Sequence, residues 1–340
     1  MAGVLAVALA AGLAPAAGAA VTLNGAGSSF AAPMYYKWAD EYHKIHPDVS
    51  INYQSVGSGA GIRQITSGTV DFGGTDAFLT EEQIKAAPAE LLHIPTLLGA
   101  VAISYNIPGV KTHLRLTPKV LADIYLGKIT YWDAKEITSL NPGVKLPHLP
   151  IFVAHRSDAS GTTNIFTNYL SKVSPEWDKK VGSGTSVNWP VGVGGKGNEG
   201  VSGVIKQNPG GIGYIELAYA VTNKLPYAAL QNKAGRYVLP TIASTSAAAA
   251  GVAIPADYRV MVSDSPNPQA YPIVGFTWML IYKNQTNKER GDALLKFIWW
   301  GLHDGEKMAS SLLYAPLPPS LVASLEKTLK TVTYQGSPIL

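Results

Sequence analysis

Short apolar runs alternate with amphipathic segments along the first 80 residues of the chain. The runs at 21–23, 49–56 and 70–76 predict strands, because short apolar stretches bounded by turn residues are typical of buried strands. The segment 30–45 instead carries an apolar residue at every third or fourth position, which predicts an amphipathic helix. This pattern favours an α/β fold in which strands and helices alternate.

Loops of small polar residues connect these strands to the helices that follow. Gly and Ser dominate the loops at 25–29 and 57–61, and Ser28 or Ser29 is expected to cap the first helix. In an open α/β sheet such loops gather at the carboxyl edge of the strands, where helix N-termini favour a negatively charged ligand. We therefore expect the first three loops to meet at one edge of the sheet.

Two longer apolar runs divide the chain. Residues 96–106 and 272–282 form nearly continuous apolar segments, and each is a candidate for a crossing between two domains. A chain of 340 residues is long enough for two domains with separate cores. We predict one domain from residues 20–98 and 272–340 and a second domain from residues 99–271.

The segment Arg156–Asn164 combines an arginine, a carboxylate and a run of small hydroxyl residues. A strand at 149–154 is predicted to precede it, and Asp158 or Ser160 is expected to cap the helix that follows. Arg156 offers a planar cation that can bind two oxygen atoms at once. The segment is therefore a candidate anion site, although a capped surface helix beside an Arg–Asp pair would explain the same residues.

Two later segments give less information. Asn198 follows a Gly-rich stretch and is expected to cap a helix that ends near Asn208. The Ala-, Ser- and Thr-rich segment at 242–251 favours no particular element.

Composition narrows the class of protein. The chain is 46% hydrophobic and only 15% charged, as expected of a globular α/β protein, and its net charge of +4 is not concentrated in a basic tract. No nucleic-acid partner is therefore expected. The sequence contains no cysteine, which excludes disulfides, thiolate catalysis and a lipid anchor attached through cysteine.

The first 19 residues are uncharged and rich in Ala, Gly, Leu and Val. They end in Ala17-Gly18-Ala19, which has the small-x-small form of a signal-peptidase site, so we predict an export signal and a mature chain that begins near Ala20. The basic region that normally opens such a signal is missing, which predicts a truncated start. An apolar N-terminal strand or helix is the alternative interpretation.

The motifs of common enzyme classes are missing from the chain. No serine lies in a G-x-S-x-G turn, and Gly194-Gly195-Lys196 lacks the glycine spacing and the hydroxyl residue of a phosphate-binding P-loop. The seven histidines show no metal-ligand spacing. The sequence therefore predicts no catalytic residue, no metal and no cofactor.

Several segments resemble, in the same order, the periplasmic phosphate-binding proteins of phosphate-specific ABC transporters. They are Gly25–Pro33, Tyr53–Gly61, Val70–Ala77, Leu126–Leu146, Arg156–Thr162, Trp189–Gly200, Gly211–Ala220 and Tyr314–Pro318. The resemblance implies a two-domain clamshell of the type II periplasmic binding class. It also implies a monomeric periplasmic protein without a membrane anchor, which captures inorganic phosphate and delivers it to the permease and ATPase subunits of a transporter.

The resemblance also implies a set of phosphate-binding residues in this chain. The first domain is expected to supply Ser29, Phe30, Ser58 and Asp76, and the second to supply Arg156, Ser160, Gly161 and Thr162, with Asp158 holding the arginine. Ser29 stands where the family often has threonine, and His155 and Ala159 replace the expected arginine and glycine. None of these departures removes a proposed ligand group.

Asp76 is the informative member of this set. A carboxylate repels an anion unless the anion carries a proton that it can share, and phosphate at neutral pH keeps a proton whereas sulfate has none. Asp76 is therefore expected to select phosphate, although a carboxylate that merely caps the next loop is an equally good interpretation of the residue alone. A secreted phosphatase or phosphotransferase, or an extracellular scavenger or adhesion protein of the same fold, are the alternative functions.

Overall fold

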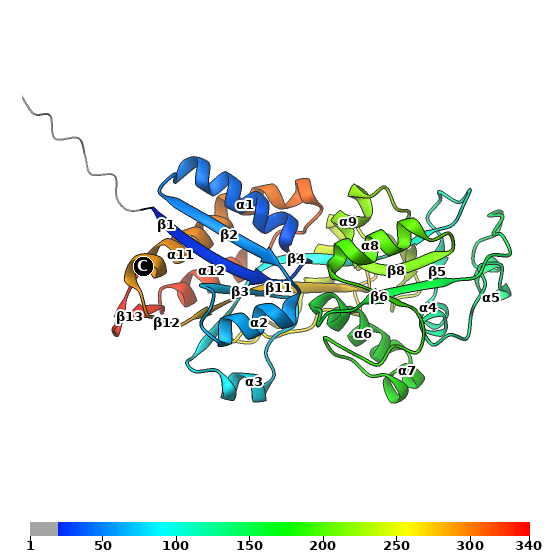
Figure 1. Cartoon of the computed structure of the whole chain (residues 1–340). Helices are drawn as coiled ribbons and strands as arrows, with labels where there is room; N and C mark the ends of the chain where they lie inside the picture. Colours follow the sequence, from blue (N-terminus) through cyan, green and yellow to red (C-terminus); the bar gives the residue numbers. More distant parts are fainter. Residues whose placement is uncertain (1–19) are drawn as a thin grey trace, which may run out of the picture.

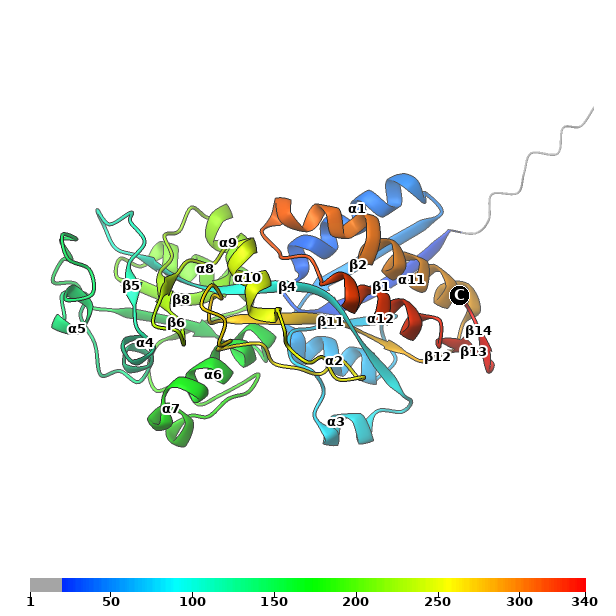
Figure 2. The same cartoon turned by 180° about the vertical axis from the view of Figure 1, so that it is seen from behind.

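The computed structural model describes residues 20–340, which form a long mixed sheet with helices on both faces (Figures 1 and 2). The sheet has eight strands in the order β2-β1-β3-β11-β4-β8-β6-β7, and two small three-stranded sheets accompany it. The predicted export signal at residues 1–19 lies outside the described residues. Between residues 20 and 340, every helix is too short or too polar to cross a membrane.

Strands of the structure alternate with helices from β1 to β4, as predicted for the first 80 residues of the chain. The elements are β1 (Val21–Gly27), α1 (Ala32–Ile45), β2 (Val49–Ser55), α2 (Ser58–Thr66), β3 (Phe72–Thr75), α3 (Glu81–Ala86), β4 (Leu91–Asn106), β5 (Arg115–Leu116), α4 (Pro118–Tyr125), α5 (Lys135–Thr138), β6 (Phe152–Arg156) and α6 (Gly161–Val173).

The second half of the chain supplies the remaining strands of the main sheet and its C-terminal cover. The elements are α7 (Pro175–Lys180), β7 (Val193–Gly195), α8 (Gly197–Gln207), β8 (Gly211–Glu216), α9 (Leu217–Thr222), β9 (Ala229–Gln231), β10 (Tyr237–Val238), α10 (Ile242–Ala249), β11 (Val274–Tyr282), β12 (Asn284–Gln285), α11 (Lys288–Trp300), the π-helix η1 (Gly301–Gly305), the 3-10 helix η2 (Glu306–Leu312), α12 (Pro319–Leu329), β13 (Thr333–Tyr334) and β14 (Ser337–Pro338).

The first three strands run parallel and end side by side. In the register of the sheet, Gly27 at the end of β1 lies opposite Ser55 of β2 and Gly74 of β3. Gly27 has φ +142, and a Cβ built on it would lie 1.9 Å from the carbonyl oxygen of Gly74, so this close approach requires glycine. The prediction that three loops meet at one edge is confirmed, and we call the loops after β1, β2 and β3 the first loop group.

Strands β6 and β7 are parallel neighbours in the other half of the sheet. The loop after β6 leads into α6, and the loop after β7 leads into α8. We call these two loops the second loop group. Figure 1 shows α6 and α8 on the half of the molecule opposite to α1, so the two groups come from opposite ends of the sheet.

Strand β4 belongs to both halves of the sheet. It pairs with β11 over Leu91–Ala100 and with β8 over Val101–Asn106, so its partner changes in the middle of the strand. The predicted domain boundary between residues 98 and 99 lies close to this change. The division of the chain into two domains at the predicted positions stays a prediction.

Several expectations about element ends were wrong. Strand β1 continues to Gly27 instead of ending at residue 23, because its small residues also pair with β2 and β3. Strand β6 spans Phe152–Arg156 rather than 149–154, since only this part pairs with β8 or β7. The segment at 242–251, for which no element was predicted, contains α10 at Ile242–Ala249, capped by Thr241.

Two predicted helix caps also differ from the structure. Helix α1 begins at Ala32 after Ala31, whose side chain cannot cap, although the Ser28 hydroxyl accepts a hydrogen bond from the Ala31 N-H at 3.2 Å. Helix α8 begins at Gly197, after Lys196, so Asn198 lies inside the helix and does not cap it. Its side chain instead donates a hydrogen bond to Ser29. The predicted cap of α6 is Ser160, which accepts a hydrogen bond from the N-H of Thr163 at 3.0 Å.

Candidate functional site

The residues expected to bind an anion are buried and lie where the two loop groups meet. A Cβ built on Gly161 of α6 would lie 2.5 Å from Ser58 Oγ and 2.6 Å from Asp76 Oδ2, so the second loop group touches the first. The N-H of Gly59 donates to the carbonyl oxygen of Ala159 at 2.9 Å across the same junction. The predicted residues are exposed by 4% at most: Ser29, Phe30, Ser58, Asp76, Arg156, Ser160 and Thr162.

Arg156 is held by Asp158. Its Nε donates to one carboxylate oxygen at 2.8 Å and its Nη2 to the other at 2.6 Å, while Nη1 donates to Thr162 Oγ1 at 3.3 Å. Burial opposes ionisation of Asp158, but the hydrogen bonds and charge of Arg156 hold its pKa below the ordinary value. The Arg156 side chain is only 1% exposed, so the alternative of an exposed helix beside an Arg–Asp pair does not describe it.

Five of the predicted site residues have a buried backbone N-H group that makes no hydrogen bond within residues 20–340. They belong to Ser29, Phe30, Ser58, Gly161 and Thr162. Buried N-H groups are nearly always paired, because an unpaired one loses its hydrogen bonds to water without compensation. Their grouping therefore points to a ligand rich in acceptors, and three of them stand at the starts of α2 and α6, where the helix dipoles favour negative charge.

The carboxylate of Asp76 lies among donors. It accepts hydrogen bonds from the hydroxyl of Ser28, from Thr277 Oγ1 at 2.8 Å and from Ser58 Oγ at 3.4 Å. Burial raises the pKa of Asp76 to about 6, although these hydrogen bonds and the charge of Arg156 act in the opposite direction. The alternative that Asp76 only caps the following loop finds no support in these contacts, which come from three other segments.

The raised pKa of Asp76 belongs to the arrangement in which the two loop groups meet, and it makes the stability of that arrangement depend on pH. Such a carboxyl contributes its full stability below the unfolded pKa of 3.8, and this contribution is lost as the pH rises through the folded pKa of about 6. A rise of the pKa from 3.8 to about 6 corresponds to at most about 3 kcal/mol, because the carboxyl is less buried when the loop groups separate. Asp76→Asn removes the titration, so the free energy of unfolding of the variant relative to the natural chain should rise by about this amount between about pH 4 and about pH 7. Urea unfolding measures the difference, and an unchanged difference would contradict a buried ionisation.

Two important residues were missed from the sequence. Asn198 lies at the centre of the junction: its backbone N-H and its Nδ2 donate to Ser29 Oγ at 3.0 and 2.9 Å, and Nδ2 also contacts Thr162 Oγ1 at 3.2 Å. Its Oδ1 accepts from the N-H of Glu216 at 2.8 Å. Thr277 comes from the central strand β11, whose apolar pattern concealed its role. The Asn198 segment was part of the family resemblance, but the residue was interpreted as a helix cap.

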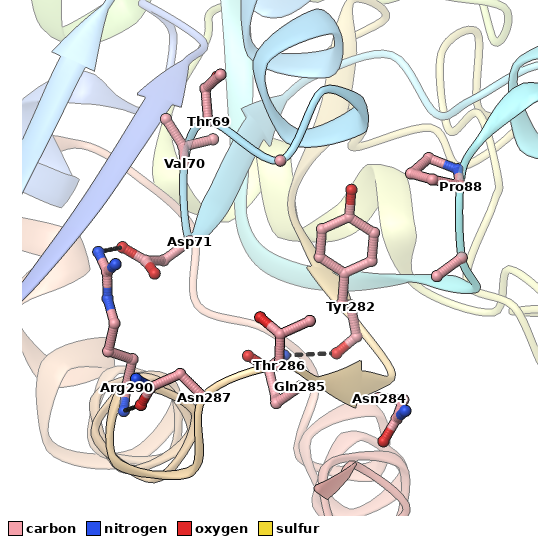
Figure 3. A pocket seen from close by; sticks show the side chains of 12 residues that line it. Thr69, Val70, Asp71, Pro88, Tyr282, Asn284, Gln285, Thr286, Asn287 and Arg290 are labelled. Carbon is pink, nitrogen blue, oxygen red and sulfur yellow. Dashed lines mark hydrogen bonds and ion pairs between the residues drawn. The ribbon is translucent and has the colours of Figure 1, made fainter. Parts of the chain in front are cut away.

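The surface pocket shown in Figure 3 contains none of the predicted anion-binding residues. This pocket has a volume of about 470 Å³. Figure 3 shows its lining, which includes Asp71, Tyr282 and Arg290. Asp71 precedes β3 whereas Asp76 follows it, so this pocket is at the opposite edge of the sheet, and Arg290 is engaged by Asp71 at 2.6 Å. Within residues 20–340, no three His, Asp or Glu side chains are grouped as metal ligands.

Comparison with known families defines the class of protein. A family model described as "PBP superfamily domain" matches residues 14–304. The match spans most of the chain and agrees with the mixed sheet and its two loop groups. The fold is that of a type II periplasmic binding protein, as the resemblance implied.

Individual relatives narrow the class further. The "Phosphate-binding protein PstS" of Xylella fastidiosa is 45% identical over 309 residues, which cover 90% of this chain and 84% of the relative. The chain belongs to the PstS family of phosphate-binding proteins.

Solved structures of more distant proteins share the fold. PfluDING, described as a high-affinity periplasmic phosphate-binding protein bound with phosphate, is 20% identical with a TM-score of 0.74, over 94% of this chain and 100% of that one. An ABC-type phosphate transport receptor from Vibrio cholerae is 19% identical with a TM-score of 0.56, over 87% and 100% of the two chains.

Proposed function

We propose that this protein is the phosphate-selective solute-binding subunit of an ABC transporter and that it binds inorganic phosphate between the two loop groups. The observation that carries the proposal is the group of five buried N-H donors around one buried carboxylate, Asp76. Its membership of the PstS family and the phosphate-bound relative of the same fold support this function. The proposed ligand residues are those given above from the resemblance, with Asn198 as an additional supporting residue.

Hydroxyl groups are expected to donate to the ligand because each already accepts at least one hydrogen bond from the protein and donates none. Ser29 Oγ accepts two hydrogen bonds from Asn198, and Thr162 Oγ1 accepts from Asn198 and from Arg156. Ser160 Oγ accepts from the N-H of Thr163. Each hydroxyl therefore keeps its own proton for a ligand oxygen. Together with the free N-H groups, these protons replace the hydration shell that phosphate loses on binding.

Selectivity is expected to come from Asp76, which is an acceptor among donors. Phosphate can donate its remaining proton to the carboxylate, whereas sulfate would face it without a proton to share. The resulting penalty for sulfate is about 1–3 kcal/mol or more, because a buried charge would be left without a hydrogen bond.

Calorimetric titration of the purified protein with phosphate, arsenate and sulfate tests the proposal. We expect tight binding of phosphate and weak or undetectable binding of sulfate. Arsenate also carries a proton at neutral pH, so its affinity shows how closely the donors fit the size of the ligand. Absence of phosphate binding would refute the proposed function, and equal binding of sulfate would refute the role of Asp76.

Arg156→Lys should weaken phosphate binding by roughly 10- to 100-fold. Arginine holds Asp158 with two nitrogens and still presents Nη1 to the site, whereas a lysine ammonium cannot do both with the same geometry. Calorimetry measures the change, and Arg63→Lys, an exposed position on α2, is the matched control. An affinity equal to that of the natural chain would remove Arg156 from the site.

The transport role extends the proposal to partners and location. We propose delivery to a permease and its ATPase from the periplasm, by a monomer without a membrane anchor, with two domains that close around the ligand. The similarity to proteins named for phosphate binding and phosphate transport supports this role. The phosphatase alternative is checked by incubating the protein with a generic phosphomonoester, and we expect no release of phosphate above the uncatalysed rate.

A further inference from the structure

Three consecutive carbonyl groups of the loop after β1 each accept a hydrogen bond from a tyrosine hydroxyl. Tyr53 donates to the carbonyl oxygen of Ser28 at 2.9 Å, Tyr219 to that of Ser29 at 2.7 Å, and Tyr314 to that of Phe30 at 2.6 Å. Three consecutive peptide groups of the loop are therefore held in place, and each is held by a tyrosine from a different part of the chain.

A hydrogen bond that fixes the orientation of a carbonyl group also fixes the orientation of the N-H group of the following residue. A trans peptide is planar, so its N-H points opposite to its C=O. Tyr53 thus orients the N-H of Ser29, and Tyr219 orients the N-H of Phe30. These are two of the five N-H groups that have no partner within residues 20–340 and that we assign to the ligand.

The three tyrosines differ in origin. Tyr53 belongs to β2, the sheet neighbour of β1, and Tyr314 precedes Ala315, which bonds to Leu98 of β4. Tyr219 belongs to α9, which follows β8, and three strands separate β8 from β1 in the sheet. Figure 1 shows α9 beside α8, on the opposite half from α1.

We propose that Tyr219 is a positioning residue for phosphate binding that aims the N-H of Phe30 only when the two halves of the molecule are closed. The inference rests on the proposed function. Tyr53 and Tyr314 keep their hydrogen bonds to the loop in any arrangement of the halves, because they approach it from its own side. Tyr219 approaches from the other side, so closure itself completes one of the donors.

The hydroxyl of Tyr219 has a second acceptor nearby. Glu199 Oε1 lies 3.0 Å from it and also accepts from Ser55 Oγ at 3.1 Å. A tyrosine hydroxyl has one proton, so the carbonyl oxygen of Ser29 at 2.7 Å and the carboxylate of Glu199 at 3.0 Å compete for it. Glu199→Gln removes the charged competitor, and the amide oxygen can still accept the hydrogen bond from Ser55, so phosphate binding should stay as tight as before or become tighter.

Tyr219→Phe tests the proposal in the full-length mature protein. We expect the dissociation constant for phosphate to rise roughly tenfold, mainly through faster dissociation, because a hydrogen bond made on closure is lost. The midpoint of thermal unfolding without phosphate should stay within about 1 °C of the natural chain, since the bond is absent when the halves are apart.

Tyr314→Phe is the matched comparison: it should lower that midpoint, because its hydrogen bond lies within one half. Tyr131→Phe, an exposed ring stacked on His148, controls for the loss of a hydroxyl.

The outcomes separate the inference from the proposed function. If the natural chain does not bind phosphate in calorimetry, the proposed function fails and the inference fails with it. If the natural chain binds and Tyr219→Phe binds equally well, only the inference is refuted. The inference is also refuted if Tyr219→Phe lowers the unfolding midpoint without phosphate as Tyr314→Phe does, since that result identifies an ordinary structural contact. Weaker binding by Glu199→Gln would show that the tyrosine proton serves Glu199 instead.

Discussion

Gly161→Ala is expected to lower the affinity for phosphate by about a hundredfold or more. The added Cβ would lie 2.5 Å from Ser58 Oγ and 2.6 Å from both Cβ and Oδ2 of Asp76. These atoms belong to the first loop group, whereas Gly161 begins α6 in the second. The methyl group would therefore hold the two groups apart and prevent the donors from converging on one ligand.

Calorimetry with phosphate and thermal unfolding without it together measure this effect. Alanine is well tolerated at the start of a helix, so the unfolding midpoint of the ligand-free variant should change little. Gly203→Ala is the control, because a Cβ at that position of α8 meets no atom within 4 Å. Tight phosphate binding by Gly161→Ala would show that the two loop groups do not have to approach this closely.

Asp76→Asn is expected to reduce the preference for phosphate over sulfate by about 5- to 150-fold. The amide carries no charge, so a fully deprotonated anion no longer faces a buried carboxylate, while the remaining donors still bind its oxygens. Most of the change should appear as a gain in sulfate binding. The phosphate affinity should fall less, because the amide oxygen can still accept the proton of phosphate.

Parallel titrations of the variant with both anions measure this ratio. Asp40→Asn, an exposed carboxylate on α1, is the control for a change in net charge and should keep the natural ratio. If the ratio in Asp76→Asn also stays the same, discrimination must arise from the donors alone, and Asp76 would be only a structural residue.

The sequence predicted the α/β class and the three converging loops because these depend on local patterns. The apolar runs of β1, β2 and β3 and the polar loops after them are each readable within about ten residues. The ends of β1 and β6 were not predictable in this way. They are set by pairing with strands distant in the sequence, and no local signal reports that pairing.

In the candidate site, too, the roles that depend on local sequence could be predicted and those that depend on contacts between distant segments could not. Ser160 could be recognised as a cap because capping is local, and the contacts of Arg156 with Asp158 involve residues two apart. Asn198 could not be separated from a capping residue, since the same side chain suits both roles and only tertiary contacts with Ser29 decide between them. Thr277 was missed because it lies within an otherwise apolar strand.

The position of β11 has a consequence for the synthesis of the protein. This strand lies between β3 and β4 and is antiparallel to both, with Leu280 opposite Gly73 of β3 and Thr277 opposite Leu97 of β4. It is nevertheless made about 200 residues after β3. While the ribosome is translating the intervening residues, β3 and β4 have no partner to join them, so the N-terminal strands cannot complete their sheet. The sheet of the nascent chain therefore stays incomplete until β11 emerges. The order of the strands in the sheet thus sets the order of events during synthesis: the halves of the sheet can be joined only after most of the chain has been made.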